Sequence, residues 1–300
     1  MKISISKIKQ SKTIRELLEF GIINIDKPSG PTSFSTSEFV CKKLDLKKTS
    51  HFGTLDPKVT GVLPVALNRA CKLTGFFLGE DKEYVGIMRI HEDVEMKKVQ
   101  EIINKKFLGT ISQKPPVKSR VKRVFRERDI EKFELLEQNE KDIMFRVICQ
   151  GGTYIRKLID DLGKEIGGAH MLELRRTRAG IFEEHNKEYP AVSLYDFEKA
   201  VDEFKEGKEE ALRKMIIPAD IVFEVYPSVF AIRDSMKNLF NGSPLHMDQL
   251  AKRKQSDDFE IGDKISVFSR DDFIGMYEVI KKENMFAKPL FVLHTPDWKK

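Results

Sequence analysis

Two charged residues stand out because their immediate surroundings do not explain them. Asp56 lies between Leu55 and Pro57, just before the apolar run Gly61–Val65. An Asp-Pro pair is common in turns, so a turn-forming residue competes with a functional acid that serves as nucleophile or base. Arg156 falls near the start of a predicted helix, where a cation opposes the helix dipole at a cost of about 0.3–1 kcal/mol. This position indicates an anionic partner, either a side chain or a phosphate, unless Arg156 simply extends into solvent.

Three further side chains suit contacts with a nucleotide, although each also has a structural explanation. Tyr84 opens a predicted strand, where a half-buried aromatic residue is the common outcome. His51 lies on a predicted loop, where it either stacks on a base or has no particular role. Lys27 precedes Pro28 and either contacts a phosphate or fixes the turn. Periodicity alone does not connect these residues.

Positive charge is concentrated in one stretch of the chain. The 300 residues include 53 basic and 47 acidic side chains, a net charge of +6. Seven basic residues and one acidic residue, Glu127, give Lys114–Arg128 the same net charge, since seven minus one is six. The basic residues are Lys114, Lys118, Arg120, Lys122, Arg123, Arg126 and Arg128. Because four of them are arginines, which bind phosphates through paired hydrogen bonds, the stretch favours nucleic-acid binding over an ordinary solvated face.

The composition excludes several classes of protein. Hydrophobic residues make up 40% and charged residues 33%, as is typical of a soluble globular protein. No run approaches the roughly 20 apolar residues of a membrane span, and the polar N-terminus predicts no signal peptide. Cys41, Cys71 and Cys149 are odd in number and far apart, which indicates a reducing, cytoplasmic environment. They form no CxxC pair and the histidines lack ligand spacing, so no metal site is expected.

The elements that would position these residues can be read from the sequence. We expect a strand over 21–26, a helix capped by Thr32 or Ser33, and a loop over 49–60 that carries Asp56. Further strands are expected over 83–90 and 142–149, the second with alternating apolar residues. Asp93 is expected to cap a helix that ends at Gly109, and Thr153 to cap a helix with an apolar stripe.

The composition changes after Gly180. An acidic, helical segment follows, in which Ser193 and Asp196 take capping positions. From about Asp220 the pattern becomes short strands broken by Gly and Asp, which predicts a domain boundary there. The overall fold class expected from these patterns is α+β.

Taken together, several segments resemble the ordered motifs of TruB-type pseudouridine synthases. These segments are Gly21–Ser33, His51–Val65, Lys82–Val94 and Val147–Gly163. Two more, Gln113–Arg128 and Ala169–Gly180, resemble the dyskerin branch, the archaeal and eukaryotic enzymes of H/ACA guide-RNA particles. The chain departs from the family pattern at Ser50, where glycine is usual, and at Gln150-Gly151-Gly152.

The resemblance assigns roles to matching residues. Asp56 corresponds to the catalytic aspartate, expected to be buried, and Arg156 to the arginine that pairs with it. Tyr84 corresponds to the tyrosine that packs on the target base and is implicated in proton abstraction. His51 corresponds to the histidine that holds the everted nucleotide, and Lys27 belongs to a largely structural motif. Further contacts to RNA are expected from Leu158, Lys118, Arg120, Lys122, Arg123, Arg175 and Arg176.

The C-terminal part is similar to a PUA domain, a small β-barrel that binds RNA. The likeness lies in Phe240–Leu245 and Phe259–Val267. The resemblance therefore implies a mixed-sheet pseudouridine synthase catalytic domain over 1–220 and a PUA-like domain over 221–300. It also implies that Met1–Leu18 packs on the PUA-like domain.

The function implied is isomerisation of uridine to pseudouridine in rRNA, directed by H/ACA guide RNA. The expected partners are guide RNA, rRNA and small H/ACA proteins, with no metal, organic cofactor or membrane, in an archaeal-type cytoplasmic protein. Two alternatives stay open. One is a guide-independent enzyme acting on the tRNA T-loop, and the other is an RNA-binding scaffold without catalysis.

Overall fold

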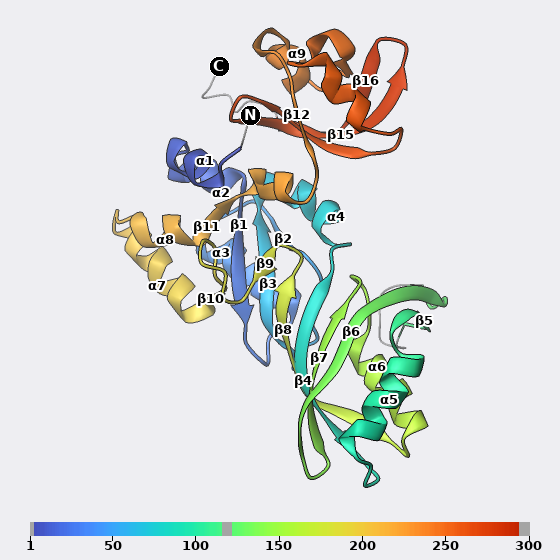
Figure 1. Cartoon of the computed structure of the whole chain (residues 1–300). Coiled ribbons are helices and arrows are strands. Elements are labelled where there is room, and N and C mark those ends of the chain that lie inside the picture. The colour runs from blue at the N-terminus through green and yellow to red at the C-terminus, as the bar shows by residue number, and fades with distance from the viewer. Residues whose placement is uncertain (1–2, 116–121, 294–300) are drawn as a thin grey trace. The chain divides into compact units, whose positions relative to one another are not determined.

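The computed structural model describes residues 3–115 and 122–293, which divide into two compact units (Figure 1). The central unit is Ile22–Ile216, and the terminal unit joins Met1–Gly21 to Ile217–Lys300. Strand β11 (Ile216–Pro218) spans the division along the chain. The catalytic and PUA-like roles assigned to parts of the chain stay predictions.

The central unit is built on one mixed sheet with the strand order β10-β1-β3-β8-β4-β7-β6-β5. β2 pairs with β3, and β9 pairs with β8. The pairs β1–β10 and β3–β8 are parallel and the other pairs are antiparallel. The strands are β1 (Gly21–Lys27), β2 (Thr49–His51), β3 (Thr60–Leu67), β4 (Lys82–Ile90), β5 (Gly109–Gln113), β6 (Arg126–Asn139), β7 (Asp142–Cys149), β8 (Ala169–Ala179), β9 (Phe182–Glu183) and β10 (Val192–Ser193).

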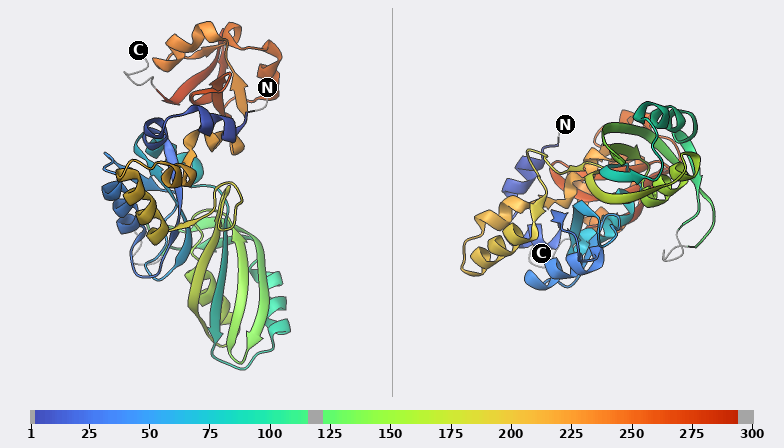
Figure 2. Two further views of the ribbon diagram at one scale, coloured as in Figure 1. Left: turned by 90° about the vertical axis from the view of Figure 1, so that its left-hand side faces the viewer. Right: turned by 90° about the horizontal axis from the view of Figure 1, so that it is seen from below.

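Helices cover this sheet, and α5 and α6 lie on the same face of its long strands (Figure 2). The core under them comes from alternation along β7, where Ile143, Phe145, Val147 and Cys149 are all buried as predicted. The apolar stripe of α6 faces the same core. The helices of this unit are α3 (Ser33–Lys43), α4 (Thr74–Phe77), α5 (Met96–Lys106), α6 (Ile155–Glu165), α7 (Leu194–Lys205) and α8 (Glu210–Met215).

Two of the predicted helix caps are correct and two are wrong. The Thr32 side chain accepts a hydrogen bond from the Ser35 amide, and Ser193 caps α7 in the same way. However, α5 begins after Glu95 rather than Asp93, and α6 begins after Tyr154. The Thr153 hydroxyl instead donates to the Gln150 carbonyl 2.7 Å away in the preceding turn, so Arg156 is the second residue of α6 rather than the third.

The terminal unit contains a second, five-stranded sheet with the order β12-β14-β15-β16-β13. Its core includes Val229, Leu239, Ile265, Tyr277 and Phe286. These strands are β12 (Ser228–Phe230), β13 (Leu245–His246), β14 (Lys264–Ser269), β15 (Asp272–Lys282) and β16 (Met285–Val292), and the helices are α1 (Ile5–Ser11), α2 (Ile14–Glu19) and α9 (Met236–Phe240). With a mixed sheet and a second curled sheet, the predicted α+β fold class is confirmed.

The N-terminal segment contacts the C-terminal part of the chain within the terminal unit. Lys12 forms an ion pair with the buried carboxylate of Asp220. The Phe20 ring stacks on Phe273 and Phe291, with ring centroids 5.6 and 6.0 Å apart. Apolar stacking and a partly buried ion pair therefore join sequence segments some two hundred positions apart.

The backbones of β3 and β8 approach each other closely at Gly61. Its φ is +103°, and a Cβ there would lie 2.2 Å from the Arg176 carbonyl oxygen. We predict that Gly61→Ala lowers the free energy of unfolding by about 2 kcal/mol or more, because backbone strain of this kind costs about 1–3 kcal/mol before the clash is counted. Urea unfolding followed by circular dichroism checks this value.

Gly75 provides the control for this substitution. It lies in α4 with ordinary φ, and a Cβ added there would meet no atom of the described residues within 4 Å. Gly75→Ala should leave the free energy of unfolding unchanged or raise it slightly, because alanine favours helix. Equal losses in the two variants would show that the β3–β8 approach is not the cause.

Candidate active site

Asp56 lies on the loop between β2 and β3. Its carbonyl accepts a hydrogen bond from the Val59 amide at 3.0 Å, which closes a turn. The neighbouring Leu55 is buried, whereas the Asp56 side chain is 53% exposed. The expected burial of the acid is therefore wrong: the turn buries its neighbours and presents the carboxylate to solvent.

Lys27 holds this loop by hydrogen bonds to backbone carbonyl oxygens. Its Nζ donates to the carbonyl oxygens of Pro28 at 2.8 Å, Pro57 at 3.0 Å and Val59 at 2.8 Å. The ammonium has three hydrogens, so these bonds use all of them. Burial lowers the pKa of Lys27, and the nearby Asp56 charge acts in the opposite direction. Of the two interpretations of Lys27, the geometry supports fixing of the turn rather than contact with a phosphate.

Ser33 provides a second anchor that the sequence did not reveal. Its hydroxyl accepts from the Leu55 amide at 2.7 Å and donates to the Leu55 carbonyl at 3.0 Å. The first residue of α3 therefore holds the residue that precedes Asp56. In the sequence, Ser33 was visible only as a candidate helix cap.

Arg156 meets Asp56 across a separation of 100 positions in the sequence. Its Nη1 donates to Oδ2 of Asp56 at 3.2 Å. The anionic partner that its helical position indicated is therefore this carboxylate. Because the two side chains are 68% and 53% exposed, the pair contributes no more than about 1 kcal/mol to stability. Its consequence is orientation of the carboxylate rather than folding energy.

Gln113 clamps the start of α6 and so fixes the origin of the Arg156 side chain. The buried amide of Gln113 accepts from the Tyr154 backbone amide at 3.0 Å and donates to the Tyr154 carbonyl at 3.2 Å. The Tyr154 amide has no acceptor inside the helix, so Gln113 supplies one, while the Tyr154 carbonyl also accepts from the Leu158 amide at 2.9 Å. No local pattern reveals this role, because Gln113 comes from β5 and lies about 40 positions away.

Two aromatic side chains to which the resemblance assigns contacts with the target nucleotide, Tyr84 and His51, are uncharged near neutral pH. Tyr84 is buried on β4, and burial raises the pKa of its hydroxyl, to which the Asp56 charge adds. His51 ends β2, with its Nε2 3.2 Å from the Thr54 hydroxyl. Burial and the nearby Arg176 charge lower the pKa of His51, so its imidazole is neutral at pH 7.

Three residues predicted to bind RNA are engaged inside the protein. Leu158 and Arg176 are fully buried, so the expected direct contacts of these two with RNA are wrong. Arg175 is partly exposed, but its guanidinium bonds Asp26 at 2.8 Å and Glu184 at 2.7 Å. Arg175 and Arg176 differ in exposure because neighbouring residues of a strand point to opposite faces of the sheet.

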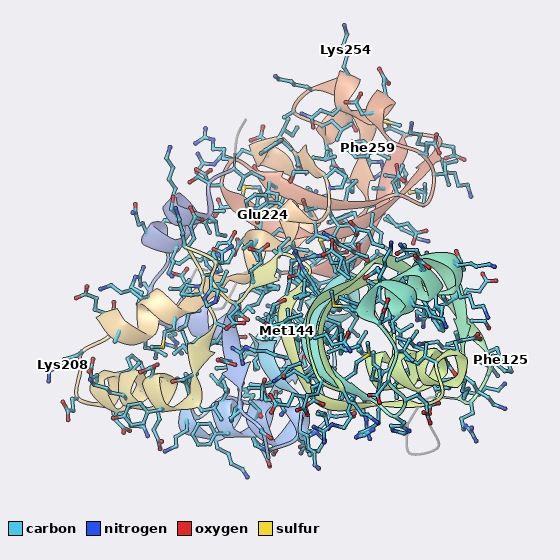
Figure 3. All side chains as sticks on the ribbon, turned by 60° about the horizontal axis from the view of Figure 1, so that its bottom comes forward. Phe125, Met144, Lys208, Glu224, Lys254 and Phe259 are labelled. Atoms are coloured by element: carbon cyan, nitrogen blue, oxygen red, sulfur yellow. The ribbon has the colours of Figure 1, made fainter. Side chains whose placement is uncertain are left out.

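Part of the basic stretch lies on the surface, and its contact with RNA stays a prediction. Lys122 and Arg123 are exposed, and Arg123 also donates to the Pro115 carbonyl at 3.1 Å. The exposed ring of Phe125 follows them (Figure 3), and the Lys114 ammonium lies 5.6 Å from its centroid. The predicted contacts of Lys118 and Arg120 lie outside the described residues.

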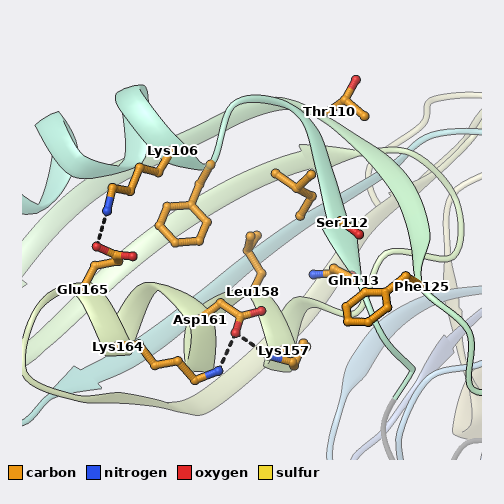
Figure 4. Close-up of a pocket in the computed structure, with 12 residues that line it drawn as sticks. Lys106, Thr110, Ser112, Gln113, Phe125, Lys157, Leu158, Asp161, Lys164 and Glu165 are labelled. Atoms are coloured by element: carbon orange, nitrogen blue, oxygen red, sulfur yellow. Dashed lines mark hydrogen bonds and ion pairs between the residues drawn. The ribbon is translucent and has the colours of Figure 1, made fainter.

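A pocket of about 530 Å³ lies between α5, β5 and α6 (Figure 4). Asp161 on its wall pairs with Lys157 and, at 2.6 Å, with Lys164. Neither Asp56 nor Arg156 lines it, so the pocket adjoins the helix of the site without containing the acid. Across the described residues, no group of three or more His, Cys, Asp or Glu side chains gathers as for a metal, and no helix is long and apolar enough to cross a bilayer.

Lys82 is a further buried cation beside the site, two residues before Tyr84 on the same face of β4. Its Nζ donates to the carbonyls of Leu78, at 3.4 Å, and Glu80. Burial lowers the pKa of Lys82 to about 8, and the Arg176 charge contributes to the same shift. A lysine at the start of a strand gives no sign of this burial in the sequence.

Comparisons with known proteins agree with this fold and site. The family model "TruB family pseudouridylate synthase (N terminal domain)" matches residues 42–155, and "tRNA pseudouridylate synthase B C-terminal domain" matches residues 156–224. The "Probable tRNA pseudouridine synthase B" of Methanopyrus kandleri is 42% identical over 263 residues, which are 87% of this chain and 75% of that protein. The curated relatives therefore cover most of the chain.

Two solved structures share the fold over nearly the whole chain. A chain of a Cbf5-Nop10-Gar1 complex has a TM-score of 0.86 and 34% identity, covering 97% of this chain and 90% of that one. A chain of an H/ACA RNP bound to a substrate RNA containing 2'-deoxyuridine has a TM-score of 0.84 and 33% identity, with the same coverage.

The fold and the family models together define an RNA pseudouridine synthase, and the chain belongs to the TruB family of these enzymes. The likeness to the Cbf5 structures places it in the dyskerin branch. The predicted family and enzyme class are confirmed.

Lys82 yields a prediction about stability and pH. Its pKa in the folded protein is about 8, below the value of 10.5 for an unperturbed lysine. Between these values the unfolded chain binds more protons, so Lys82 makes the free energy of unfolding rise with pH. We predict that wild type gains about 3 kcal/mol over Lys82→Met between pH 7.5 and 10.5, measured by urea unfolding at each pH.

Lys98 is the matched control, since it is exposed on α5. The difference in free energy of unfolding between wild type and Lys98→Met should not change over the same pH range. A flat difference for Lys82→Met as well would contradict a lowered pKa of the buried Lys82 amine.

Proposed function

We propose that this chain converts uridine to pseudouridine in rRNA selected by H/ACA guide RNA, with Asp56 as the catalytic residue. The observation that carries the proposal is the 3.2 Å contact between Oδ2 of Asp56 and Nη1 of Arg156. Support for guide direction comes from the structural likeness to Cbf5 in a Cbf5-Nop10-Gar1 complex and to a chain in an H/ACA RNP bound to substrate RNA. Guide RNA, rRNA and small proteins of that kind are the proposed partners, in the cytoplasm.

The reaction breaks the glycosidic bond to nitrogen, turns the uracil and rejoins it to the sugar through carbon. Asp56 is exposed enough to reach the sugar, where its carboxylate serves as nucleophile or as base. Arg156 holds the carboxylate by a charge-assisted hydrogen bond, which restricts its direction of attack. The returning uracil is itself the second nucleophile, so one carboxylate suffices.

Tyr84 and His51 are the proposed contacts to the target nucleotide. A base inside a duplex is inaccessible to the acid, so the uridine must turn out of the stack, where an aromatic ring supports it by about 1–3 kcal/mol. Because the raised pKa keeps the Tyr84 hydroxyl protonated, it accepts the proton from the uracil carbon only if its own proton passes on. The neutral imidazole of His51 suits a hydrogen bond or stacking rather than charge pairing.

The remaining parts bind RNA without reading its sequence. The exposed Lys122 and Arg123 are proposed to contact phosphates, which fix register but carry no sequence information. We assign 1–220 to the catalytic domain and 221–300 to the PUA-like RNA-binding domain, on which the N-terminal segment packs. Base pairing with the guide then selects the site.

A second candidate is guide-independent modification of the tRNA T-loop. The names of the curated relatives, "Probable tRNA pseudouridine synthase B", favour it. Phosphate contacts of the same kind serve either substrate, so charge does not separate the two functions.

We predict that Asp56→Asn abolishes isomerisation while RNA affinity stays within about twofold of wild type, because an amide neither attacks the sugar nor removes a proton. Release of hydrogen from the uracil carbon that receives the sugar measures the reaction, and filter binding measures affinity. Asp160→Asn, which removes an exposed carboxylate of α6, should retain full activity. Hydrogen release by Asp56→Asn at the wild-type rate would refute the assignment, and a wild type that binds RNA without turnover would indicate a scaffold.

A second experiment separates the substrates. Purified protein, with the small H/ACA proteins added, is incubated with an rRNA fragment or a tRNA transcript, each with and without a matched guide RNA. We expect pseudouridine in rRNA only with its guide. Product on tRNA alone, and none on guided rRNA, would favour the guide-independent enzyme.

A further inference from the structure

A buried arginine joins both ends of the loop that carries Asp56. The side chain of Arg176, on β8, is 1% exposed. Its Nε donates to the Val62 carbonyl at 2.8 Å, and its Nη2 donates to the Gly53 carbonyl at 3.1 Å. Gly53 precedes Asp56 by three residues and Val62 follows it by six, so one planar guanidinium sets the separation of the two ends of the loop.

The backbone is adapted to this contact at Gly53. Its φ is +104°, and a Cβ there would lie 3.3 Å from Nη1 of Arg176 and 3.7 Å from Cε of Lys82. The loop therefore crosses directly over two buried cations, at a residue without a side chain. This crossing explains a glycine within the His51–Val65 segment.

Arg176 also adjoins Tyr84. The two residues are partners in the β4–β8 register, with the strand register shifting between Glu83 and Tyr84. Facing residues on paired strands bring their Cβ atoms within about 4.5–5.5 Å of each other. Burial raises the pKa of the Tyr84 hydroxyl, and the nearby Arg176 charge acts in the opposite direction. Arg176 thus bonds the loop of Asp56 through its guanidinium and lies opposite Tyr84 on the neighbouring strand.

The charge of Arg176 is not explained by folding alone. Among the described residues, no carboxylate lies within ion-pair distance of Arg176, Lys27 or Lys82, and carbonyl oxygens are their hydrogen-bond acceptors. Burying cations without carboxylate partners is costly, because the charged form loses its hydration. An arginine retained here indicates a requirement for its fork of donors at fixed angles.

We propose that Arg176 is a positioning residue for this reaction: its buried guanidinium fixes the Asp56 loop relative to Tyr84. The inference rests on the proposed function, because it assumes that these two residues work on the same nucleotide. It replaces the phosphate contact expected of Arg176 with an internal role.

Arg176→Lys tests the proposal because it keeps the charge but loses the planar fork. We expect the single-turnover rate with saturating RNA to fall about 100-fold, the usual effect of a displacement near 1 Å at a reacting centre, with RNA affinity within twofold of wild type. Arg176→Gln, which also removes the charge, should be at least as slow. The matched control is Arg89→Lys on β4, where an exposed arginine pairs with Asp142, and it should react at the wild-type rate.

A double variant separates positioning from general loss of structure. If Arg176 acts through the geometry of Tyr84 and the loop, Arg176→Lys combined with Tyr84→Phe is no slower than the slower single variant, whereas independent effects multiply. Circular dichroism at the assay temperature identifies variants that fail to fold. If Arg176→Gln fails to fold, the rate of Arg176→Lys tests the proposal.

Three results would overturn the proposal. They are a rate for Arg176→Lys within threefold of wild type, a loss of rate matched by loss of RNA affinity or of folded protein, and multiplying losses in the double variant. The Asp56→Asn variant separates failure of the positioning role from failure of the proposed function. If it is inactive while Arg176→Lys is fully active, only the positioning role fails, and if it is active the proposed function fails first.

Discussion

The contact between Asp56 and Arg156 depends on a scaffold, because an exposed ion pair cannot assemble itself. A pair of this exposure is worth about 1 kcal/mol at most, too little to order two segments a hundred positions apart. The ordering comes from buried hydrogen bonds to backbone on each side. Lys27 holds the loop of the acid, and Gln113 holds the first turn of the arginine's helix. The protein thus fixes main chain first and lets two solvent-exposed side chains meet as a consequence.

Much of this arrangement could be predicted from the sequence. The alternation of β7, the stripe of α6 and the Thr32 cap depend on neighbours close in sequence, so local patterns suffice for them. Local reasoning failed where tertiary contacts competed. Thr153 bonds the preceding turn rather than capping α6, and Gln113 from β5 bonds the residue at which the helix begins. Residue type predicts a possible helix cap, but whether the side chain caps the helix depends on which other groups lie within hydrogen-bond distance.

The candidate site shows the same limit. Residue types marked Asp56, Arg156 and Tyr84 as candidates and the family resemblance assigned their roles, but neither could assign burial. The Asp56 carboxylate is exposed because of the path of its loop, and Arg176 is buried because of the strands beside β8. Ser33 and Lys82 were missed for a related reason, since their partners are carbonyl oxygens, which every residue carries and no sequence pattern marks.

The two neighbouring arginines of β8 make different polar contacts on opposite faces of the sheet. Arg175 meets carboxylates at a partly exposed site, where dissolved ions weaken attraction, while Arg176 meets carbonyl dipoles out of reach of those ions. Raising ionic strength should therefore weaken the ion pairs of Arg175 well before it weakens the hydrogen bonds by which Arg176 holds the loop of Asp56. The path of that loop is in this way insulated from the salt content of the surrounding solution.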